Sequence, residues 1–380
     1  MSGPLRPTSF SLVGLTMLDV GPLRGTTSVD LTDNGGVPTN LYLIMGPNGA
    51  GKTTILDAIY QGMALLGGRS HPEYLLEALN RRGAGIQLDA LVQLDDGVRS
   101  QARLLSIVAG GPGLLKSWTP DELGRLELDS SQIVLQFDRR SSVAPVEVLP
   151  DPDGEAIAFL DAIRERAGEQ PSALFGTSMA LPTVLYFPSG RGIQRAPANR
   201  RTIMRPDLLG YSPARRFGVD GDTWEDSIEN LLVWFTWLDP DLERSCRDTV
   251  NQIAFRQNKR ITPVDRQNLS VVVETGSGER HRLDQLSSGE RQLVQLVVRI
   301  AAHMTRSTIV LIDETEQHLH TVMRRRLLNI LKEWAQQHEG LSFIMTSHQA
   351  ESMRLLAPKL VEEGLHKGGC LVKPPFEAPR

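Results

Sequence analysis

The spacing of apolar positions near the start of the chain predicts strands, a loop and a helix. Strand-like runs occupy 10–13 and 27–31, and a third run, Leu41 to Met45, is apolar throughout. A glycine-rich loop, Gly46 to Thr54, follows directly. Beyond it, apolar residues recur at helical spacing from Ile55 to Leu66, until two glycines end the pattern.

The pattern changes to alternation between 86 and 150. Apolar and polar residues alternate from Ile86 to Leu94, an Asp-Gly turn follows, and further strand-like runs lie at 104–106 and 133–137. These runs predict an antiparallel β region.

A linker rich in proline, aspartate and glycine at 150–154 opens the next part of the chain. Helical spacing then covers 155–166 and the stretch from 224 to about 251, which we expect to break at Asp239-Pro240. Between the two helices, 184–187 has the composition of a strand.

The last third returns to alternating strands and helices. A hairpin is predicted about 276–278, a helix over 288–303 and a buried strand over 308–312. A helix over 322–337 and a strand over 342–346 complete the pattern. No internal repeat and no long heptad array is present in the sequence.

Composition and charge narrow the class of protein. The 380 residues are 40% hydrophobic and 23% charged, which is typical of a soluble globular protein. The formal net charge of -4 gives the chain as a whole no electrostatic preference for nucleic acid. The two cysteines, Cys246 and Cys370, are far apart, which excludes a disulfide framework and a cysteine zinc site. Since the sequence has neither a secretion signal nor a run of the ~20 apolar residues that span a bilayer, we expect a cytoplasmic protein.

The glycine-rich loop matches the phosphate-binding pattern GxxxxGK[ST] in full, as GPNGAGKT. Glycines let consecutive backbone N–H groups face phosphate oxygens, Lys52 would reach the β and γ phosphates, and the Thr53 hydroxyl would ligate Mg²⁺. We therefore predict nucleotide binding by Pro47, Asn48, Gly49, Ala50, Gly51, Lys52, Thr53 and Thr54.

Two adjacent carboxylates follow the apolar run at 308–312. Parallel strands bind ligands at their C-terminal ends, so Asp313 is expected to hold Mg²⁺ and Glu314 to orient and deprotonate the attacking water. Taken alone, the motif is equally compatible with a strand that ends in two solvated acids.

The stretch Leu286-Ser-Ser-Gly-Glu has two interpretations. Ser287 and Glu290 form a capping box before an amphipathic helix, which is a purely structural role. The same turn exposes N–H groups at the positive end of a helix, so that Ser287, Ser288, Gly289 and Glu290 could bind an anion.

A histidine, His348, ends the last predicted core strand, in Thr346-Ser347-His348. A lone histidine is usually structural, but one downstream of the carboxylates can donate a hydrogen bond to a γ-phosphate. Glu314, His348 and Lys52 are the catalytic candidates.

In this order, GPNGAGKT, LSSGE, LIDE and TSH resemble the motifs of ABC-type ATPases. The stretch YLIMGPNGAGKTTILDAI is similar to the branch that contains SMC, RecF and OLD proteins and many AAA-domain ATPases of bacterial defence and repair operons. The resemblance covers about 9–66 and 271–348, and leaves the middle of the chain poorly covered.

The resemblance implies an α/β fold: a P-loop ABC-type ATPase head with an N-terminal antiparallel β subdomain and an inserted helical lobe. It implies a single ABC-type ATPase domain over 1–380, whose four parts are the start of the nucleotide-binding lobe (1–85), the antiparallel β region (86–150), a helical insertion with an arginine-rich segment (151–265), and the part with the signature, the acidic strand end and the switch histidine (266–380).

In this family two heads pair head to tail, and the signature serine of one head contacts the γ-phosphate held by the other. Carried over, Lys52 and Thr53 would face Ser288 and Gly289 of a second copy, and each isolated site would be incomplete.

The loop after the carboxylates has a place in the same resemblance. Its residues 317–320 would cross the dimer interface. Thr315 stands where many members have proline, which leaves the path of that loop open.

The family also has a glutamine that senses Mg²⁺. Gln93 lies at a transporter-like distance from Lys52, whereas the stretch 186–190 lies where SMC-like proteins place this junction. Both assignments remain open at the sequence level.

The spacing between Lys52 and Ser288 is much longer than a transporter ATPase needs, which indicates an insertion. Within it, 191–216 carries one acid and seven arginines: Arg191, Arg195, Arg200, Arg201, Arg205, Arg215 and Arg216. This charge could contact DNA phosphates or an acidic partner, or form a solvated loop. The tryptophans at 224, 234 and 237 are expected in the core or at a partner interface rather than as base-stacking platforms.

The leading functional prediction is an ATP- and Mg²⁺-dependent ATPase that dimerises, or forms a higher homo-oligomer, and couples nucleotide state to a partner effector protein or to DNA. Little of the chain follows His348, so a nuclease or toxin effector is expected to be a separate polypeptide. A role in anti-phage defence or DNA repair follows by analogy. The alternatives are a nucleotide-binding scaffold with little turnover and a transporter ATPase subunit.

Overall fold

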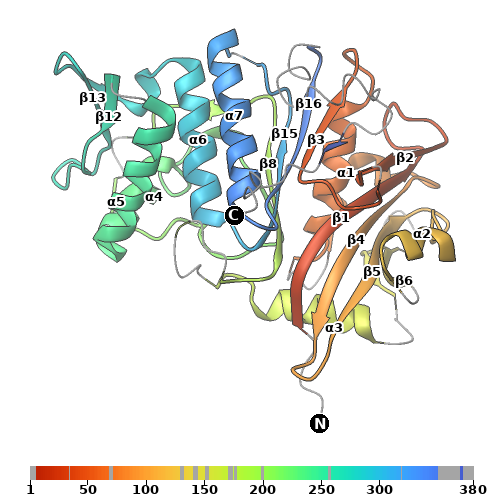
Figure 1. Ribbon diagram of the computed structural model, residues 1–380. Helices are drawn as coiled ribbons and strands as arrows, with labels where there is room; N and C mark the ends of the chain where they lie inside the picture. Colours follow the sequence, from red (N-terminus) through yellow and green to blue (C-terminus); the bar gives the residue numbers. More distant parts are fainter. Residues whose placement is uncertain are drawn as a thin grey trace, which may run out of the picture.

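The chain forms two large β-sheets with helices between and beside them (Figure 1). The computed structural model describes residues 6–33, 35–67, 72–128, 132–139, 144–149, 154–169, 174, 178–197, 201–255, 258–317, 319–349 and 369–370. Within these ranges, none of the helices is both long and apolar enough to cross a membrane.

The first sheet has the strand order β2-β1-β4-β5-β6-β7. Its strands are β1 (Arg6–Leu18), β2 (Thr26–Asp30), β4 (Gly85–Asp95), β5 (Ser100–Gly110), β6 (Gln132–Asp138) and β7 (Glu147–Val148). Pairing is antiparallel in all but one pair, as expected. The exception is β5 with β6, which run parallel, so the prediction was wrong at this pair. A parallel pair needs a crossover, and the connection between these strands contains the short helix α2 (Pro120–Arg125).

The second sheet has the strand order β10-β8-β15-β16-β3-β17. Its strands are β3 (Leu41–Met45), β8 (Pro182–Phe187), β10 (Ala214–Arg216), β15 (Ser307–Ile312), β16 (Ser342–Ser347) and β17 (Gly369–Cys370). All are parallel except β17, which pairs antiparallel with β3. The long apolar runs of the sequence therefore become strands that are covered on both faces.

The parallel sheet separates two hydrophobic cores. Because successive side chains of a strand point to opposite faces, Val310 and Ile312 of β15 lie in one core, while Ile309 and Leu311 lie in the other. The second core is shared with the first sheet and with two helices, α1 (Lys52–Ala64) and α3 (Glu155–Glu165).

The other core is built around four helices (Figure 1). They are α4 (Ile228–Leu238), α5 (Pro240–Val250), α6 (Ser288–His303) and α7 (Thr321–Gln337). The predicted break between α4 and α5 is confirmed: the Asp239 carboxylate caps α5 by accepting from the Asp241 N–H, and Pro240 occupies its first position.

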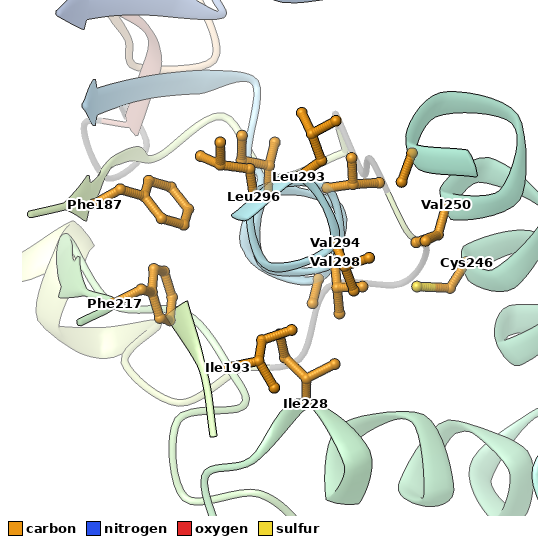
Figure 2. Close-up of a cluster of buried hydrophobic side chains, with 14 of the residues drawn as sticks. Phe187, Ile193, Phe217, Ile228, Cys246, Val250, Leu293, Val294, Leu296 and Val298 are labelled. Atoms are coloured by element: carbon orange, nitrogen blue, oxygen red, sulfur yellow. The ribbon is translucent and has the colours of Figure 1, made fainter. Parts of the chain in front are cut away.

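Helix α6 lies at the centre of this core. Figure 2 looks along it and shows apolar side chains from several elements around it, among them Phe187 from β8, Ile228 from α4 and Val250 from α5. Cys246 is buried in the same cluster and carries a free thiol. Burial on all sides explains why the apolar positions of α6 extend beyond one stripe.

The segment 151–265 contributes more than helices. It supplies α3, α4 and α5, but also β8 and β10, which are strands of the parallel sheet. A short parallel pair, β9 (Gly192–Ile193) with β11 (Val219–Asp220), also comes from this segment. Its helical character is thus concentrated in α3, α4, α5 and the short π-helical turn Asn251–Phe255, and part of the segment belongs to the central sheet.

The remaining strands form a small antiparallel sheet before α6. It has the order β12-β13-β14, with β12 at Lys259–Ile261, β13 at Val272–Thr275 and β14 at Arg280–Arg282. The hairpin predicted about 276–278 is confirmed. Of the tryptophans, Trp224 is buried in the core as expected, whereas Trp237 at the end of α4 is 40% exposed.

Candidate nucleotide-binding site

The phosphate-binding loop joins the end of β3 to the start of α1, as its sequence requires. Gly49 and Gly51 both adopt left-handed backbone, with φ of 80° and 88°, which glycine adopts without the strain that a side chain would cause. A Cβ at position 51 would also lie 2.9 Å from the Leu23 side chain. The local sequence therefore determines both the turn and the helix start.

Lys52 points back over this loop. Its Nζ donates to the carbonyl oxygens of Gly46 and Pro47, each at 2.9 Å, and the residue is buried. The ammonium group is thus held beside the backbone that would surround phosphate oxygens.

Thr53 connects the loop to the acidic strand end. Its hydroxyl donates to Asp313 Oδ2 at 2.9 Å, although the two residues are 260 positions apart. The predicted metal ligands are therefore adjacent in space. A hydroxyl beside a carboxylate at a phosphate loop fits the oxygen ligands that Mg²⁺ prefers.

Asp313 is held on its other side by Thr346. The buried Thr346 hydroxyl donates to Asp313 Oδ1 at 2.6 Å and accepts from the Glu314 N–H at 2.7 Å. One side chain at the end of β16 therefore positions both carboxylate-bearing residues at the end of β15.

Glu314 adopts a left-handed backbone conformation, with φ of 47°. Such a conformation costs about 1–3 kcal/mol outside glycine and persists only where neighbours enforce it. Here the hydrogen bonds to Thr346 and to Arg191, which donates to the Glu314 carbonyl at 3.1 Å, enforce it. The backbone therefore leaves the regular course of the strand at Glu314, whose side chain is half-buried.

His348 is paired with a carboxylate that the sequence did not single out. Its Nδ1 lies 2.7 Å from Glu316 Oε1, and the same oxygen accepts from the His348 backbone N–H at 2.7 Å. Glu316 is almost fully buried and also accepts from the Thr315 hydroxyl at 3.1 Å. The histidine tip at the end of β16 is therefore oriented by the loop that follows β15, leaving Nε2 as the nitrogen that can face a ligand.

Thr315 itself ties this loop to β16, because its N–H donates to the Thr346 carbonyl at 3.1 Å. The threonine that replaces the proline of related sequences is thus fully buried and hydrogen-bonded.

The turn before α6 forms the capping box that its sequence predicts. The Ser287 hydroxyl accepts from the Glu290 N–H, and Glu290 accepts from the Ser287 N–H at 3.0 Å. Lys259 of β12 donates to both oxygens of the same carboxylate, at 2.9 and 3.0 Å. The turn is therefore fixed to the small sheet as well as to its own helix.

The three residues Ser287, Ser288 and Gly289 of this turn differ in exposure. Ser287 and Ser288 are exposed, whereas Gly289 is buried. A Cβ at position 289 would lie 3.1 Å from the Leu319 side chain, so glycine lets the turn lie this close to the start of α7. The exposed serines could face a ligand on a second molecule.

The first turns of α1 carry a further acid near the site. Burial raises the pKa of Asp57, and the negative Asp313 adds to this rise, while the Tyr186 hydroxyl and the charge of Arg216 lower it. Burial likewise raises the pKa of Tyr186, which keeps its hydroxyl protonated.

Gln93 lies far from the phosphate loop. It pairs with Ser9 in the register of β1 with β4, nine positions before Leu18, where β1 ends. Gly21, just beyond that end, is the part of the chain that approaches Thr54. At ~3.3 Å per residue, Gln93 lies roughly 30 Å from the loop along the strand. The assignment of Gln93 as a metal-sensing residue was therefore wrong, because β4 runs away from the site.

The other stretch considered for that role, 186–190, lies beside the carboxylates. The Phe187 carbonyl accepts from the Asp313 N–H at 2.9 Å, and the chain continues from there to Arg191. Arg191 is 5% exposed and therefore cannot contact a DNA backbone, so the structure corrects this part of the arginine prediction.

Two more arginines of the segment are held inside the fold. Arg201 forms an ion pair with Glu229 at 2.9 Å and donates to the Leu269 carbonyl at 3.0 Å. Arg215 donates to the Gly210 carbonyl at 2.7 Å, and burial lowers its pKa to about 10. Both side chains hold parts of the fold together, so they are not placed for the contact with DNA or an acidic partner that the sequence left open.

The remaining described arginines are exposed but come from separate places. Arg195 follows β9, Arg205 donates to the Gly168 and Leu209 carbonyls, and Arg216 lies over the Tyr186 ring. Arg200 lies outside the described residues.

Sequence reasoning missed two residues of the site, Thr346 and Glu316. It named Arg191 but missed that this residue is buried beside the carboxylates. Thr346 and His348 belong to one motif, so the position of Thr346 at the end of an apolar strand could have identified it as a site residue. The partners of Glu316 and Arg191 are distant along the chain, and no local pattern identifies them.

Comparisons with known proteins match both ends of the chain. Residues 15–74 match a family model described as "AAA domain". Residues 222–354 match one described as "AAA domain, putative AbiEii toxin, Type IV TA system". The search of curated proteins returned no match.

Among solved structures, the chain is similar to the SMC head domain from Thermotoga maritima, at 14% identity and a TM-score of 0.38, with 91% of this chain and 92% of that chain covered. It is also similar to the Smc head domain bound to the C-terminal domain of ScpA, derived from Pyrococcus furiosus, at 11% identity and a TM-score of 0.40, with coverage of 91% and 92%. A third is a dimeric post-hydrolysis state of the ATP-binding cassette MJ0796 bound to ADP and Pi, at 13% identity and a TM-score of 0.33, with coverage of 91% and 90%. At these values no residue's role is carried over from them.

Proposed function

We propose that this chain is an ATP-hydrolysing switch that dimerises head to tail on ATP. The matches of residues 15–74 and 222–354 to AAA-domain models support the proposal. The observation that carries the proposal is the contact between Thr53 and Asp313, which joins the phosphate loop to the acidic strand end. If the glycine loop were only a turn and the two acids only a solvated strand end, a hydrogen bond between Thr53 and Asp313 would not be expected.

The proposal assigns Mg²⁺ to Thr53 and Asp313. Their oxygens already lie within hydrogen-bond distance, and Asp313 keeps a second donor in Thr346 that would orient its carboxylate. When bound, the ion would neutralise charge on the β and γ phosphates. Lys52 would supply further positive charge once phosphate oxygens replace the two loop carbonyls as its acceptors.

Glu314 is the proposed general base. It follows Asp313 directly at the end of β15, and its left-handed backbone is held by Thr346 and Arg191. Phosphoryl transfer needs an aligned water more than covalent chemistry, so a carboxylate held rigidly beside the γ-phosphate is well suited to the task. His348, fixed through Nδ1 by Glu316, would donate from Nε2 to the γ-phosphate.

The second half of each site is proposed to come from another copy of the chain. The exposed Ser287 and Ser288 stand at a helix N-terminus, where N–H groups and the helix dipole favour an anion. A γ-phosphate held by one copy would then be enclosed only when the turn of the other copy meets it.

We further assign the output of this switch to a separate effector protein, such as a nuclease or toxin, or to DNA. The toxin–antitoxin description of the family that matches residues 222–354 supports an effector in a defence setting.

The test is phosphate release and dimerisation with ATP and Mg²⁺. Wild-type protein should hydrolyse ATP, while Glu314→Gln should bind ATP, hydrolyse it at least ~100-fold more slowly and accumulate as a dimer. Lys52→Ala should lose nucleotide affinity. Glu333→Gln, an exposed site on α7, is the matched control and should behave as wild type.

Two results would overturn the proposal. One is wild-type turnover no faster than that of Glu314→Gln, with partners and DNA present. The other is a protein that remains monomeric at saturating ATP in both forms.

A further inference from the structure

The side chain of Arg191 lies where three parts of the site meet. Its Nη1 donates to the carbonyl oxygens of Asp313 at 2.6 Å and Pro188 at 3.2 Å. Its Nη2 donates to the Glu314 carbonyl at 3.1 Å and to Gln292 Oε1, on α6, at 3.4 Å. One guanidinium therefore joins the acidic strand end, the end of β8 and the helix that begins at the signature turn.

The stretch 188–193 is attached to α6 a second time. Arg291, the residue before Gln292, donates through Nη1 to the Ile193 carbonyl at 3.0 Å. Figure 2 shows the Ile193 side chain beside Val294 and Val298 of α6. The connection between β8 and β9 therefore follows α6 closely.

An arginine in this position is costly. The four groups that accept from Arg191 within the described part of the chain are neutral oxygens. Burial lowers the pKa of the guanidinium to about 10, although the charges of Asp313, Glu316 and Glu314 act in the opposite direction. Burying a charge without a direct counter-ion is unfavourable unless many acceptors are held around it. The planar fork of arginine spreads its N–H donors over several nitrogens and so reaches acceptors further apart than the single ammonium group of a lysine can.

We propose that Arg191 is a positioning residue that couples the signature helix α6 to Glu314 within one copy of the chain. The inference rests on the composite site of the proposed function. When Ser288 of this copy meets the phosphate held by its partner, α6 moves as a rigid body, and Gln292, one turn further along, carries the movement to Arg191. Arg191 passes it to the Glu314 carbonyl, so that closure of one site sets the catalytic carboxylate of the other.

Gln292→Leu is the sharpest test, because it removes the α6 end of this link and leaves the contacts of Arg191 with the strand end. We expect kcat for ATP to fall about tenfold with KM unchanged, since Lys52 and Thr53 are untouched. Gln295→Leu is the matched control: it is an equally buried glutamine on α6 whose Nε2 donates to the Gly218 carbonyl, away from Arg191. Its kcat should remain within about twofold of wild type.

Arg191 itself is tested with lysine. Arg191→Lys keeps the charge but reaches fewer acceptors, so we expect a fall in kcat at least as large as that of Gln292→Leu, with nucleotide affinity retained. Thermal unfolding of each variant identifies one that has failed to fold, in which case Gln292→Leu decides the outcome.

A mixture of two proteins shows in which copy Gln292 acts. When wild-type protein is mixed with an excess of Glu314→Gln, most wild-type copies pair with a variant copy. The variant copy supplies its signature turn but cannot hydrolyse ATP, so turnover comes from the wild-type copies. The double variant Gln292→Leu/Glu314→Gln should support wild-type turnover equally well, because the link in the active copy is intact. A lower rate would mean that the substitution damages the signature turn, and would overturn the inference.

The proposed function and this inference fail in different ways. If the wild type neither dimerises nor hydrolyses ATP, the proposed function fails. If the wild type does both and Gln292→Leu matches Gln295→Leu in kcat, the coupling through Arg191 is refuted while the function stands.

Discussion

Replacing Thr346 with valine removes one hydroxyl and keeps the shape of the side chain. Thr346 is fully buried, donates to Asp313 Oδ1 at 2.6 Å and accepts from the Glu314 N–H at 2.7 Å. The substitution should therefore affect both carboxylate-bearing residues without opening a cavity.

The size of the effect follows from these two bonds. A buried N–H left without its acceptor costs about 1–3 kcal/mol, and a hydrogen bond to a charged group contributes about 1.5–3 kcal/mol. Two terms reduce this loss. Asp313 still accepts from the Thr53 hydroxyl. If the Glu314 backbone relaxes from its left-handed conformation, about 1–3 kcal/mol of strain is also relieved. We expect Thr346→Val to lower the free energy of unfolding by about 2–3 kcal/mol.

Urea unfolding measures this as a shift in midpoint at an unchanged m-value. Thr346→Ser keeps the hydroxyl, and its free energy of unfolding should fall by less than about 1.5 kcal/mol. In the same variants, ATP turnover should fall with valine and persist with serine. A valine variant as stable and active as wild type, or a serine variant as impaired as valine, would refute this account of the strand end.

Three further substitutions test other contacts. Glu316→Gln removes the charge that orients His348, so ATP turnover should fall while nucleotide affinity measured by fluorescence titration stays near wild type. Arg201→Leu leaves the Glu229 carboxylate buried without its partner, and should lower the free energy of unfolding by about 3–5 kcal/mol in urea. Burial beside two arginines lowers the pKa of His303 well below its usual value. Since the unfolded chain binds a proton there below about pH 6.5, stability should be lost as pH falls below that value, by up to ~1.4 kcal/mol per pH unit, and His303→Leu should reduce this loss.

Each of these predictions has an outcome that would contradict it, and the buried ion pair also has a control variant. Exposed Arg195→Leu should unfold as wild type, and equal stability of the Arg201 and Arg195 variants would contradict the buried pair. His303→Leu should flatten the pH dependence below about pH 6.5, and an unchanged slope would exclude this histidine as its source. If Glu316→Gln hydrolyses ATP at the wild-type rate, the orientation of His348 by Glu316 has no part in the mechanism.

Local patterns predicted much of the fold. Glycine spacing and helical periodicity located the phosphate loop and α1, and the capping box at Ser287 located the start of α6. The apolar runs 308–312 and 342–346 predicted two central strands, because buried parallel strands have few polar positions.

The failures came where a contact joins distant parts of the chain. The distance from Lys52 along the sequence suggested Gln93, but the register of β4 carries it away from the site. The dense arginines after β8 were compatible with a contact to DNA or to an acidic partner, or with a solvated loop. In the structure, Arg191 and Arg201 instead have acceptors 122 and 28 residues away, respectively, that no pattern near them indicates.

The position of β3 has a consequence for how this protein is made. Its neighbours in the sheet are β16 and β17, the last two described strands along the chain, so both leave the ribosome after the other strands of that sheet. Until then, the strand that leads into the phosphate loop has neither of its neighbours in that sheet. Asp313, which binds Thr53, is made only shortly before β16. The nascent chain must therefore protect the apolar edges of β3 while all of the chain between β3 and β16 is made, and nucleotide can assist folding only after Asp313 has been made.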